Sequence, residues 1–224
     1  MIDNSTPLSS QEYDANIENT VPFYSEFYKQ TIDLVKSFHI YEGKWLDTGC
    51  GTGTFLFEVI KVFPLFQYVL CDPSKEMILQ AKKKLAEVKT ELTFRVCGSQ
   101  QLKYNSEFDI ITAIQSQHYL PFDDRVLATR RCYDALKENG VVIFFENFAP
   151  KSERSKSIVM ERWGRYQKSH GKSDVKIRQH QQRYGTNYLP ITLDEHFKLL
   201  SEAGYKTMDI FWLSYMQAGF YAIK

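Results

Sequence analysis

The sequence has almost no net charge and no long apolar run. Its 28 Lys and Arg stand against 27 Asp and Glu, so the net charge of +1 gives no field that would steer the chain toward nucleic acid. No apolar stretch approaches the roughly 18 residues of a membrane span, and residues 1–10 lack the basic and apolar regions of a signal peptide. We therefore expect a cytoplasmic protein with no membrane partner, in which 224 residues fold as one domain.

Cysteine is also scarce. The four cysteines, Cys50, Cys71, Cys97 and Cys132, lack the close paired spacing of a zinc site. In a reducing compartment they stay thiols, so we expect them to be structural and we expect no bound metal.

The glycine-rich stretch at residues 44–53 lacks one residue of the dinucleotide-binding fingerprint. That fingerprint needs a glycine at position 54, where a threonine stands; the chain instead carries Asp47 followed by Gly49, Gly51 and Gly53. Glycines let the backbone turn sharply and touch a ligand, and the helix predicted after them points its N–H groups back at the site. Because the carboxylate of Asp47 would repel phosphates, the motif indicates a cationic ligand. A tight turn without a ligand is the alternative.

Short apolar strands alternate with helical patterns along most of the chain. Beyond the glycine motif, strands are predicted at residues 66–72, 92–97, 108–114, 141–145, 205–213 and 216–223. Helices are predicted at residues 54–63, 74–87, 124–137 and 193–203, the third closed by Asn139-Gly140. This order is typical of an α/β fold with a doubly wound, mostly parallel seven-stranded sheet of the Rossmann-like type. The last two strands need a hairpin, so the last strand should run antiparallel.

Residues at the carboxyl ends of the strands are candidates for cofactor binding, because ligands lie there in such a sheet. Asp72 ends a strand about 20 residues past the glycines, where a carboxylate accepts hydrogen bonds from ribose hydroxyls. It could instead cap the next helix. Pro73 and Met77 follow it, and Ile114 and Gln115 end another strand. We expect all five residues to contact the cofactor.

Two titratable residues at further strand ends are candidates for chemistry. His118 closes the polar run at residues 115–118, and Glu146 ends the strand predicted at residues 141–145. We predict that they orient or deprotonate an acceptor. A histidine in such a place is more often a hydrogen-bonded structural residue, which is the alternative.

The N-terminal residues 1–40 are expected to cover the site. Residues 1–20 are polar and without pattern, whereas near-helical apolar spacing predicts a helix that ends at about Phe38. Tyr13 and Tyr24 either fold over the ligands, Tyr24 at the cofactor and Tyr13 at the acceptor, or pack this helix on the core.

Residues 149–190 interrupt the alternation of strands and helices. They are polar, basic and aromatic, with helical character, which is typical of a lid over an acceptor. A solvated face or an interface is the alternative. Besides Tyr13, the predicted acceptor contacts are Tyr119, Trp163 and Tyr184, and such aromatic residues favour a small, partly apolar acceptor over a polymer. A monomer and a homodimer both stay open.

The glycine motif resembles that of the class I S-adenosylmethionine (SAM) methyltransferases, and almost the whole chain resembles their carboxy-SAM synthase branch, which serves tRNA wobble-uridine modification. The resemblance is carried by residues 20–25 (TVPFYS), 146–148 (ENF), 171–174 (GKSD), 195–196 (EH), 203–205 (AGY) and 219–224 (GFYAIK). It implies SAM as cofactor, S-adenosylhomocysteine as product, and the methionine end of SAM at Asp47 and the glycines. It also implies that Ser99, where the family has an acidic residue, reads the adenine amino group.

The chain departs from the synthase branch at two places. That branch carries Gly-Cys-Ser-Leu-Gly where this chain has Gly49-Cys50-Gly51-Thr52-Gly53, and the arginine that pairs the extra carboxylate of carboxy-SAM aligns with Leu199. A buried unpaired carboxylate is expensive, so we predict plain SAM and methyl transfer to a small molecule. If carboxy-SAM is preferred instead, Arg178 or Arg183 of the lid would supply the charge. A synthase-like enzyme and a non-catalytic SAM-binding protein are the two alternatives.

Overall fold

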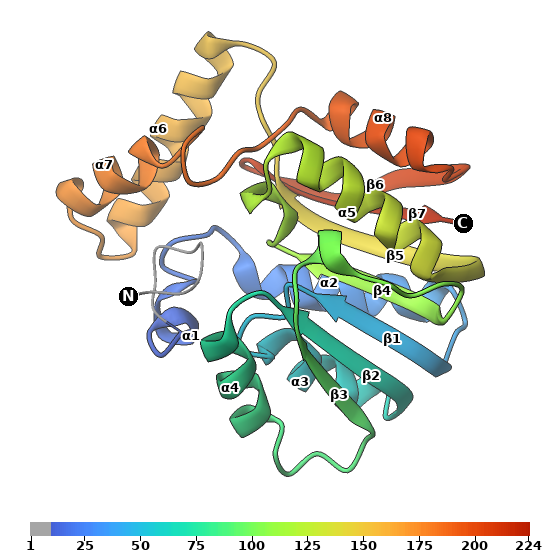
Figure 1. Ribbon diagram of the computed structural model, residues 1–224. Coiled ribbons are helices and arrows are strands. Elements are labelled where there is room, and N and C mark those ends of the chain that lie inside the picture. Colours follow the sequence, from blue (N-terminus) through green and yellow to red (C-terminus); the bar gives the residue numbers. More distant parts are fainter. Residues whose placement is uncertain (1–9) are drawn as a thin grey trace.

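A seven-stranded sheet forms the centre of the protein (Figure 1). The computed structural model describes residues 10–224. The strands have the order β3-β2-β1-β4-β5-β7-β6, in which β7 alone runs antiparallel to the other six. Their bounds are β1 Glu42–Thr48, β2 Leu65–Asp72, β3 Leu92–Val96, β4 Phe108–Ile114, β5 Leu136–Asn147, β6 Thr207–Ser214 and β7 Gln217–Ile223. The predicted mostly parallel sheet with a closing antiparallel strand is confirmed.

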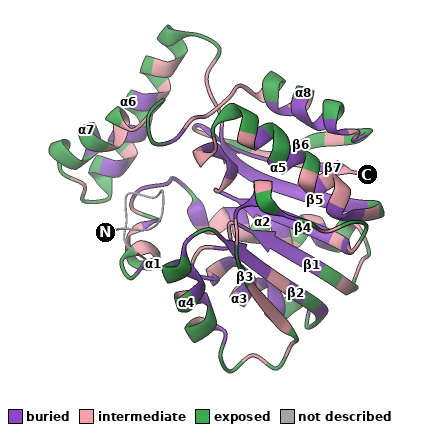
Figure 2. Cartoon of the chain, viewed as in Figure 1, coloured by how far each residue is buried: buried purple, intermediate pink, exposed green. Residues whose placement is uncertain are grey.

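Helices cover both faces of the sheet, and each face has its own buried core (Figure 2). Side chains of α2, α3 and α4 pack on one face, and those of α5 and α8 pack on the other. The bounds are α1 Tyr13–Asn16, α2 Tyr24–Ser37, α3 Thr54–Val62, α4 Lys75–Lys84, η1 Ser99–Gln101, η2 Gln117–Tyr119, α5 Phe122–Ala135, α6 Glu153–Ser169, α7 Asp174–Gln182 and α8 Leu193–Ala203. None of these helices combines the length and apolar character needed to cross a bilayer.

The boundary between α5 and β5 differs from the prediction. The helix ends at Ala135 and the chain passes directly into β5, which already pairs at Leu136 with Phe108 of β4. Asn139, with φ 62°, and Gly140 therefore lie inside the strand, where the register shifts, and do not end the helix. Asn and Gly favour turns and bulges as readily as helix ends, so the dipeptide alone did not distinguish them.

Helices α6 and α7, which lie in the predicted lid, extend beyond the sheet (Figure 1), and α6 contacts the N-terminal segment. The carbonyl oxygen of Thr20 accepts hydrogen bonds from Trp163 Nε1 (2.7 Å) and Gln167 Nε2 (3.0 Å). The Tyr166 hydroxyl donates to the carbonyl of Glu18 at 2.9 Å. Hydrogen bonds thus join α6 to the N-terminal segment.

Candidate cofactor and acceptor site

The glycine loop connects β1 to α3, and its three glycines fall into two groups by what surrounds them. All three have positive φ values, 73° at Gly49, 55° at Gly51 and 77° at Gly53, which glycine adopts without strain. A Cβ atom at Gly49 would lie 2.2 Å from Cβ of Ser116, and one at Gly53 would lie 3.1 Å from Cβ of Ala81. A Cβ atom at Gly51 would meet nothing within 4 Å. Gly49 and Gly53 permit close packing, whereas Gly51 leaves its face open.

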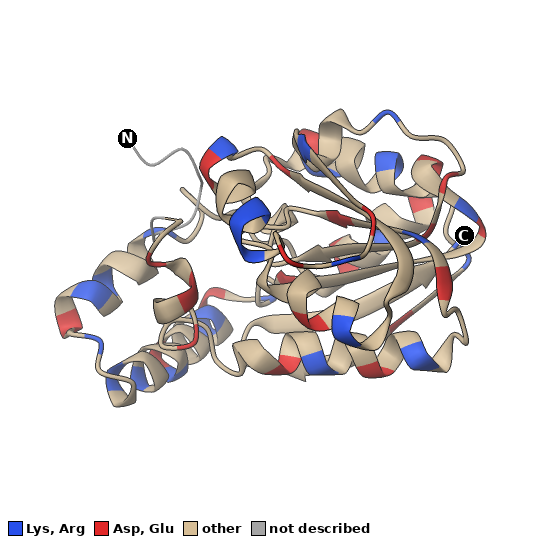
Figure 3. Ribbon diagram, turned by 90° about the horizontal axis from the view of Figure 1, so that it is seen from below, with Lys and Arg blue, Asp and Glu red and all other residues tan. Residues whose placement is uncertain are grey.

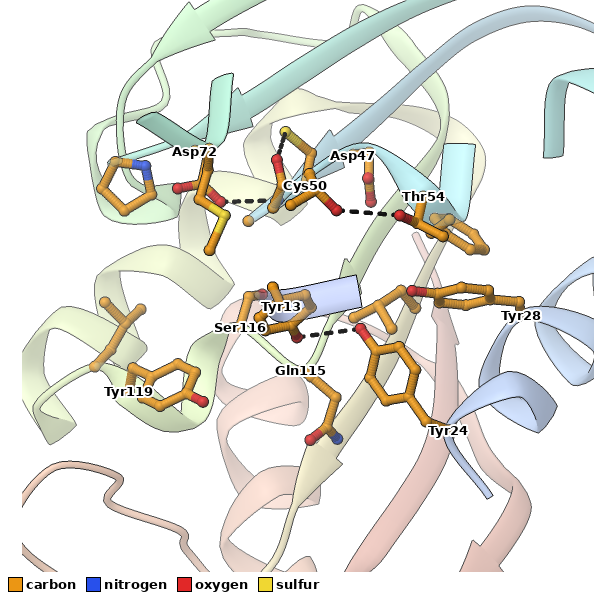
Figure 4. A pocket seen from close by; sticks show the side chains of 18 residues that line it. Tyr13, Tyr24, Tyr28, Asp47, Cys50, Thr54, Asp72, Gln115, Ser116 and Tyr119 are labelled. Atoms are coloured by element: carbon orange, nitrogen blue, oxygen red, sulfur yellow. Dashed lines mark hydrogen bonds between the residues drawn. The ribbon is translucent and has the colours of Figure 1, made fainter. Parts of the chain in front are cut away.

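A cavity of about 210 Å³ lies beside this loop at the carboxyl ends of the strands (Figure 4). Most of the predicted cofactor contacts line it, namely Tyr24, Asp47, Gly49, Gly51, Asp72, Pro73, Met77, Ile114 and Gln115. Two carboxylates and no Lys or Arg are among the 18 lining residues. We call this space the cofactor cavity.

Asp47 is a buried carboxylate at the end of β1. Trp45 Nε1 donates to Thr112 Oγ1 at 3.0 Å, and Thr112 Oγ1 in turn donates to Asp47 Oδ1 at 2.7 Å. No other hydrogen bond reaches the Asp47 side chain from the described residues, and its exposed fraction is 2%. Burial, which outweighs the Thr112 hydrogen bond, and the nearby charge of Asp72 raise the pKa of Asp47 to about 7. A cationic ligand would restore the ionised form.

Asp72 fixes the shape of the glycine loop. Its Oδ2 accepts from the Gly51 N–H at 2.9 Å and its Oδ1 accepts from the Ser74 N–H at 2.8 Å. The cap of α4 is the Ser74 hydroxyl, which accepts from the Met77 N–H at 3.0 Å. Asp72 is therefore not the helix cap, and it lines the cavity where the ribose contact is predicted.

Tyrosine side chains form the opposite wall of the cofactor cavity. The hydroxyls of Tyr13 and Tyr24 lie 3.2 Å apart, and the rings of Tyr24 and Tyr28 have centroids 5.3 Å apart. Burial raises the pKa of each of these phenols, so they are neutral at pH 7. Tyr28 was missed in the sequence, although it lies four residues after Tyr24 on the same helix face. Electron-rich rings of this kind favour a cation.

Asp14 of α1 joins the N-terminal segment to the glycine loop. Its Oδ1 accepts from the hydroxyls of Thr52 (2.7 Å) and Thr54 (2.8 Å), and its Oδ2 lies 2.5 Å from Lys84 Nζ. These contacts hold Tyr13, the neighbour of Asp14, against the cavity. The sequence contained no signal for this contact, because an aspartate in a polar segment is unremarkable until the chain folds back on itself.

Gln115 starts the loop after β4 in a left-handed conformation, with φ 53°. Its N–H donates to the Phe145 carbonyl at 2.6 Å, but its side-chain Nε2 is buried without a partner. A buried unpaired donor is unfavourable, and this one lies where a ligand would meet it.

His118 and Glu146 contact each other and not the cavity. His118 Nδ1 lies 2.6 Å from Glu146 Oε2, and the backbone N–H groups of Gln117 and His118 each donate to Glu146 at 2.9 Å. His118 Nε2 lies 3.3 Å from the Asn147 amide, so both ring nitrogens are engaged. Although burial alone would raise it, His118 and the Gln117 N–H hold the pKa of Glu146 below its usual value. This pair positions η2, whose last residue is Tyr119. Neither His118 nor Glu146 lines the cofactor cavity or the smaller cavity beside it, so their predicted role toward an acceptor stays a prediction.

A second, smaller cavity lies between the N-terminal segment, η2 and the lid, and we call it the acceptor cavity. Tyr13, Gln115 and Tyr119 line both cavities. The other lining residues are Ile17, Thr20, Val21, Asn147, Trp163, His180, Arg183 and Tyr188. Tyr13, Tyr119 and Trp163, all predicted acceptor contacts, are thus brought together. His180, Tyr188 and Asn147 were missed because their places depend on the fold of the lid.

Tyr184 and Leu199 lie elsewhere than predicted. Tyr184 faces an outer groove, where Lys156 Nζ lies 4.5 Å from its ring centre, because the chain after α7 turns Tyr188 inward in its place. Leu199 is buried on α8, which packs against α5, and it lines neither cavity. The prediction that position 199 faces the cofactor is therefore wrong, and it gives no argument against carboxy-SAM.

Two predicted cofactor contacts do not line the cofactor cavity. Ser99 shares a 2.8 Å hydrogen bond with the Thr48 hydroxyl behind the glycine loop, and Gly53 faces Ala81. The cavity wall contains other residues that the sequence did not single out, namely Tyr28, Cys50, Thr52, Thr54, Phe55, Ser116 and Leu120.

Comparison with known proteins finds a matching family model and individual proteins of similar sequence. A family model described as a methyltransferase domain matches residues 46–142. The chain is 28% identical over 213 residues to the carboxy-S-adenosyl-L-methionine synthase of Nautilia profundicola, covering 95% of this chain and 90% of that protein. It is 24% identical over 218 residues to the protein of the same name from Methylococcus capsulatus, covering 95% and 89%.

Two solved structures share the fold. A SAM-dependent methyltransferase from Leishmania major superposes with a TM-score of 0.66 at 17% identity, covering 99% of this chain and 78% of that one. The CMeT domain of citrinin polyketide synthase superposes with a TM-score of 0.69 at 15% identity, covering 95% and 56%.

Proposed function

We propose that the chain is a class I SAM-dependent methyltransferase and that it transfers the methyl group of SAM to a small-molecule acceptor held under the predicted lid. The observation that supports this proposal best is the charge of the cofactor cavity. Two buried carboxylates, Asp47 and Asp72, face a space that has several tyrosine rings and, among its described lining residues, no Lys or Arg. Such a space disfavours phosphates and suits a ligand that carries an aminium and a sulfonium.

The lining residues have separate tasks in holding SAM. Asp47 would pair with the aminium group and Asp72 would accept hydrogen bonds from the ribose hydroxyls, while the open face of Gly51 lets the ligand approach the backbone. When bound, SAM supplies a methyl group on a sulfonium, which becomes a neutral thioether as the acceptor's lone pair forms the new bond.

The residues shared by the two cavities would place the acceptor against the methyl group. Tyr13, Gln115 and Tyr119 carry neither a carboxylate nor an imidazole, so their contribution is orientation. Holding two reacting atoms in near-attack geometry supplies a large part of the acceleration of a bimolecular transfer. The buried Nε2 of Gln115 is placed to donate a hydrogen bond to the acceptor or to SAM.

A synthase-like reaction is the second candidate, because the similar proteins are named carboxy-SAM synthases and Arg183 lines the acceptor cavity. A guanidinium there could pair with a carboxylate carried by the cofactor. Because Leu199 lines neither cavity, it gives no argument against this candidate. Arg183 would then pair with the extra carboxylate of carboxy-SAM, the role that the resemblance assigns to an arginine of the synthase branch.

Two experiments test the proposal. Calorimetry with S-adenosylhomocysteine should give a Kd in the micromolar range, roughly 8 kcal/mol. Absence of binding would contradict the proposal. A panel of small acceptors with methyl-labelled SAM should then yield a labelled product, whereas incubation with SAM and prephenate followed by mass analysis of the nucleoside should leave SAM unchanged. Formation of carboxy-SAM would favour the second candidate.

We also propose a cytoplasmic location. The described cysteines are all free thiols, with Cys50, Cys71 and Cys132 buried, as expected in a reducing compartment.

A further inference from the structure

Two cysteines lie next to each other at the carboxyl ends of β2 and β3. Cys71 is the second-last residue of β2, and Cys97 follows directly after β3. Cys71 is in register with Arg95, and side chains two positions apart on a strand point to the same side, so Cys71 and Cys97 lie on the same face of the sheet. Both pack in the same hydrophobic cluster on that face. The Cys97 N–H donates to the Asp72 carbonyl at 3.1 Å, so the pairing of the two strands continues to this position.

The two thiols differ in exposure and in acidity. Cys71 is fully buried, whereas Cys97 is partly exposed to solvent. A hydrogen bond from the Cys71 thiol and the nearby Arg95 guanidinium lower the pKa of Cys97 to about 7, although partial burial opposes this change. The same hydrogen bond, together with burial, raises the pKa of Cys71. Lys and Arg are interspersed with Asp and Glu over the helices (Figure 3), so these local contacts favour the thiolate and no broad positive field is needed.

The backbone around Cys71 holds the glycine loop. The Cys71 carbonyl accepts hydrogen bonds from the N–H groups of Gly49 (2.7 Å) and Cys50 (2.9 Å). The next residue, Asp72, accepts from the Gly51 N–H at 2.9 Å through its carboxylate. Three consecutive N–H groups of the loop thus depend on residues 71 and 72, so a movement of this strand end changes the loop that lines the cofactor cavity.

We propose that Cys71 and Cys97 form a redox-sensitive pair, in which a peroxide converts the two thiols to a disulfide that loosens the glycine loop and weakens cofactor binding. The Cys97 thiolate attacks one peroxide oxygen and the O–O bond breaks, which gives a sulfenic acid and a hydroxide that takes up a proton to become water. The Cys71 sulfur then attacks the Cys97 sulfur, and the S–S bond replaces the S–O bond. The departing hydroxide takes the Cys71 proton and leaves as a second water. The two thiols thereby lose two electrons, which reduce the peroxide.

The disulfide would change the geometry of the two strand ends. Bonded sulfur atoms lie about 2 Å apart, which is much closer than two thiols that share a hydrogen bond. The ends of β2 and β3 must therefore shift toward each other when the bond forms. Because Cys71 and Asp72 also hold the glycine loop, this shift weakens the hydrogen bonds to its N–H groups.

Mass spectrometry of the full chain tests the pair directly. After treatment with hydrogen peroxide and blocking of the remaining thiols, peptide mapping should find Cys71 linked to Cys97, and dithiothreitol should release the link. Cys132→Ala should form the same link, because this cysteine of α5 is outside the pair. Cys97→Ser should form none, and Cys71→Ala should stop at a sulfenic acid that dimedone traps. Free thiols at both positions after peroxide, or irreversible oxidation of Cys97 without a link, would overturn the proposal.

Two measurements show whether the disulfide affects the cofactor cavity. Hydrogen exchange of the glycine-loop amides needs no cofactor and should become about tenfold faster in the oxidised protein, as expected when a hydrogen bond is weakened. S-adenosylhomocysteine should bind about tenfold more weakly after oxidation and with full affinity after dithiothreitol, whereas peroxide should leave its affinity for Cys97→Ser unchanged. Unchanged loop exchange in the linked protein would overturn the proposal. The affinity measurement rests on the proposed SAM site. If the reduced protein does not bind S-adenosylhomocysteine, the methyltransferase proposal fails, and the link and the loop exchange still decide this one.

Discussion

Replacing Asp47 with asparagine should make the cofactor-free protein more stable and should weaken the binding of the cofactor. The asparagine amide keeps the shape of the side chain and can still accept the hydrogen bond from Thr112, but the substitution removes a carboxylate that is buried without a cation. Raising the pKa of a carboxyl from 3.8 to about 7 corresponds to about 4 kcal/mol, which is the penalty for ionising Asp47 in the folded protein.

The folded and the unfolded protein lose the Asp47 proton at different pH values, and this difference makes the free energy of unfolding depend on pH. The unfolded chain ionises Asp47 near pH 4 and the folded protein ionises it near pH 7. Between these values the unfolded state binds fewer protons, so the free energy of unfolding falls as the pH rises. The advantage of Asp47→Asn over the wild type should therefore be about 2 kcal/mol at pH 5 and about 4 kcal/mol at pH 8.

Denaturant unfolding at these two pH values, with the exposed Asp123→Asn as control, measures the difference. Saturating S-adenosylhomocysteine should cancel the advantage, because its aminium pairs with Asp47; the variant should bind about 1.5–3 kcal/mol more weakly. At pH 7 binding to the wild type should also release about half a proton, visible as a buffer-dependent binding enthalpy. Parallel stability curves for wild type and variant between pH 5 and pH 8 would refute this reasoning.

Three further changes test other parts of the site. Asp72→Ala should weaken S-adenosylhomocysteine binding by about 1.5–3 kcal/mol in calorimetry, because it loosens Gly51 as well as removing the ribose contact; unchanged affinity would contradict both roles. Asp14→Ala should raise the dissociation rate of S-adenosylhomocysteine up to about tenfold in stopped-flow experiments, because it releases α1 from the loop, and an unchanged rate would show that α1 does not retain the ligand. Glu146→Ala should lower the free energy of unfolding by about 3–5 kcal/mol, since it leaves buried partners unpaired; activity retained in Glu146→Gln would favour positioning over proton transfer.

Features that depend on local sequence could be predicted. The glycine loop, the carboxylates Asp47 and Asp72 and the two closing strands follow from spacing and periodicity, and the structure places them as expected. These signals are local because a strand end and a turn need particular residues at particular positions.

Features that depend on distant segments could not be predicted. The contact of Asp14 with Thr52 and Thr54 joins residues about forty positions apart, and His180 reaches the acceptor cavity only because α7 packs back on α6. The alignment also misplaced one residue. It put Leu199 at the cofactor, whereas this side chain is buried on α8 and lines neither cavity.

The hydrogen bonds from α6 to the carbonyls of Thr20 and Glu18 affect the order in which ligands bind and leave. Since Asp14 also holds this segment to the glycine loop, we expect the predicted lid and the cofactor wall to move together. Opening the lid far enough to release a methylated product therefore disturbs Tyr13 and, with it, the grip on S-adenosylhomocysteine. The enzyme should load its cofactor first and discharge both products in close succession.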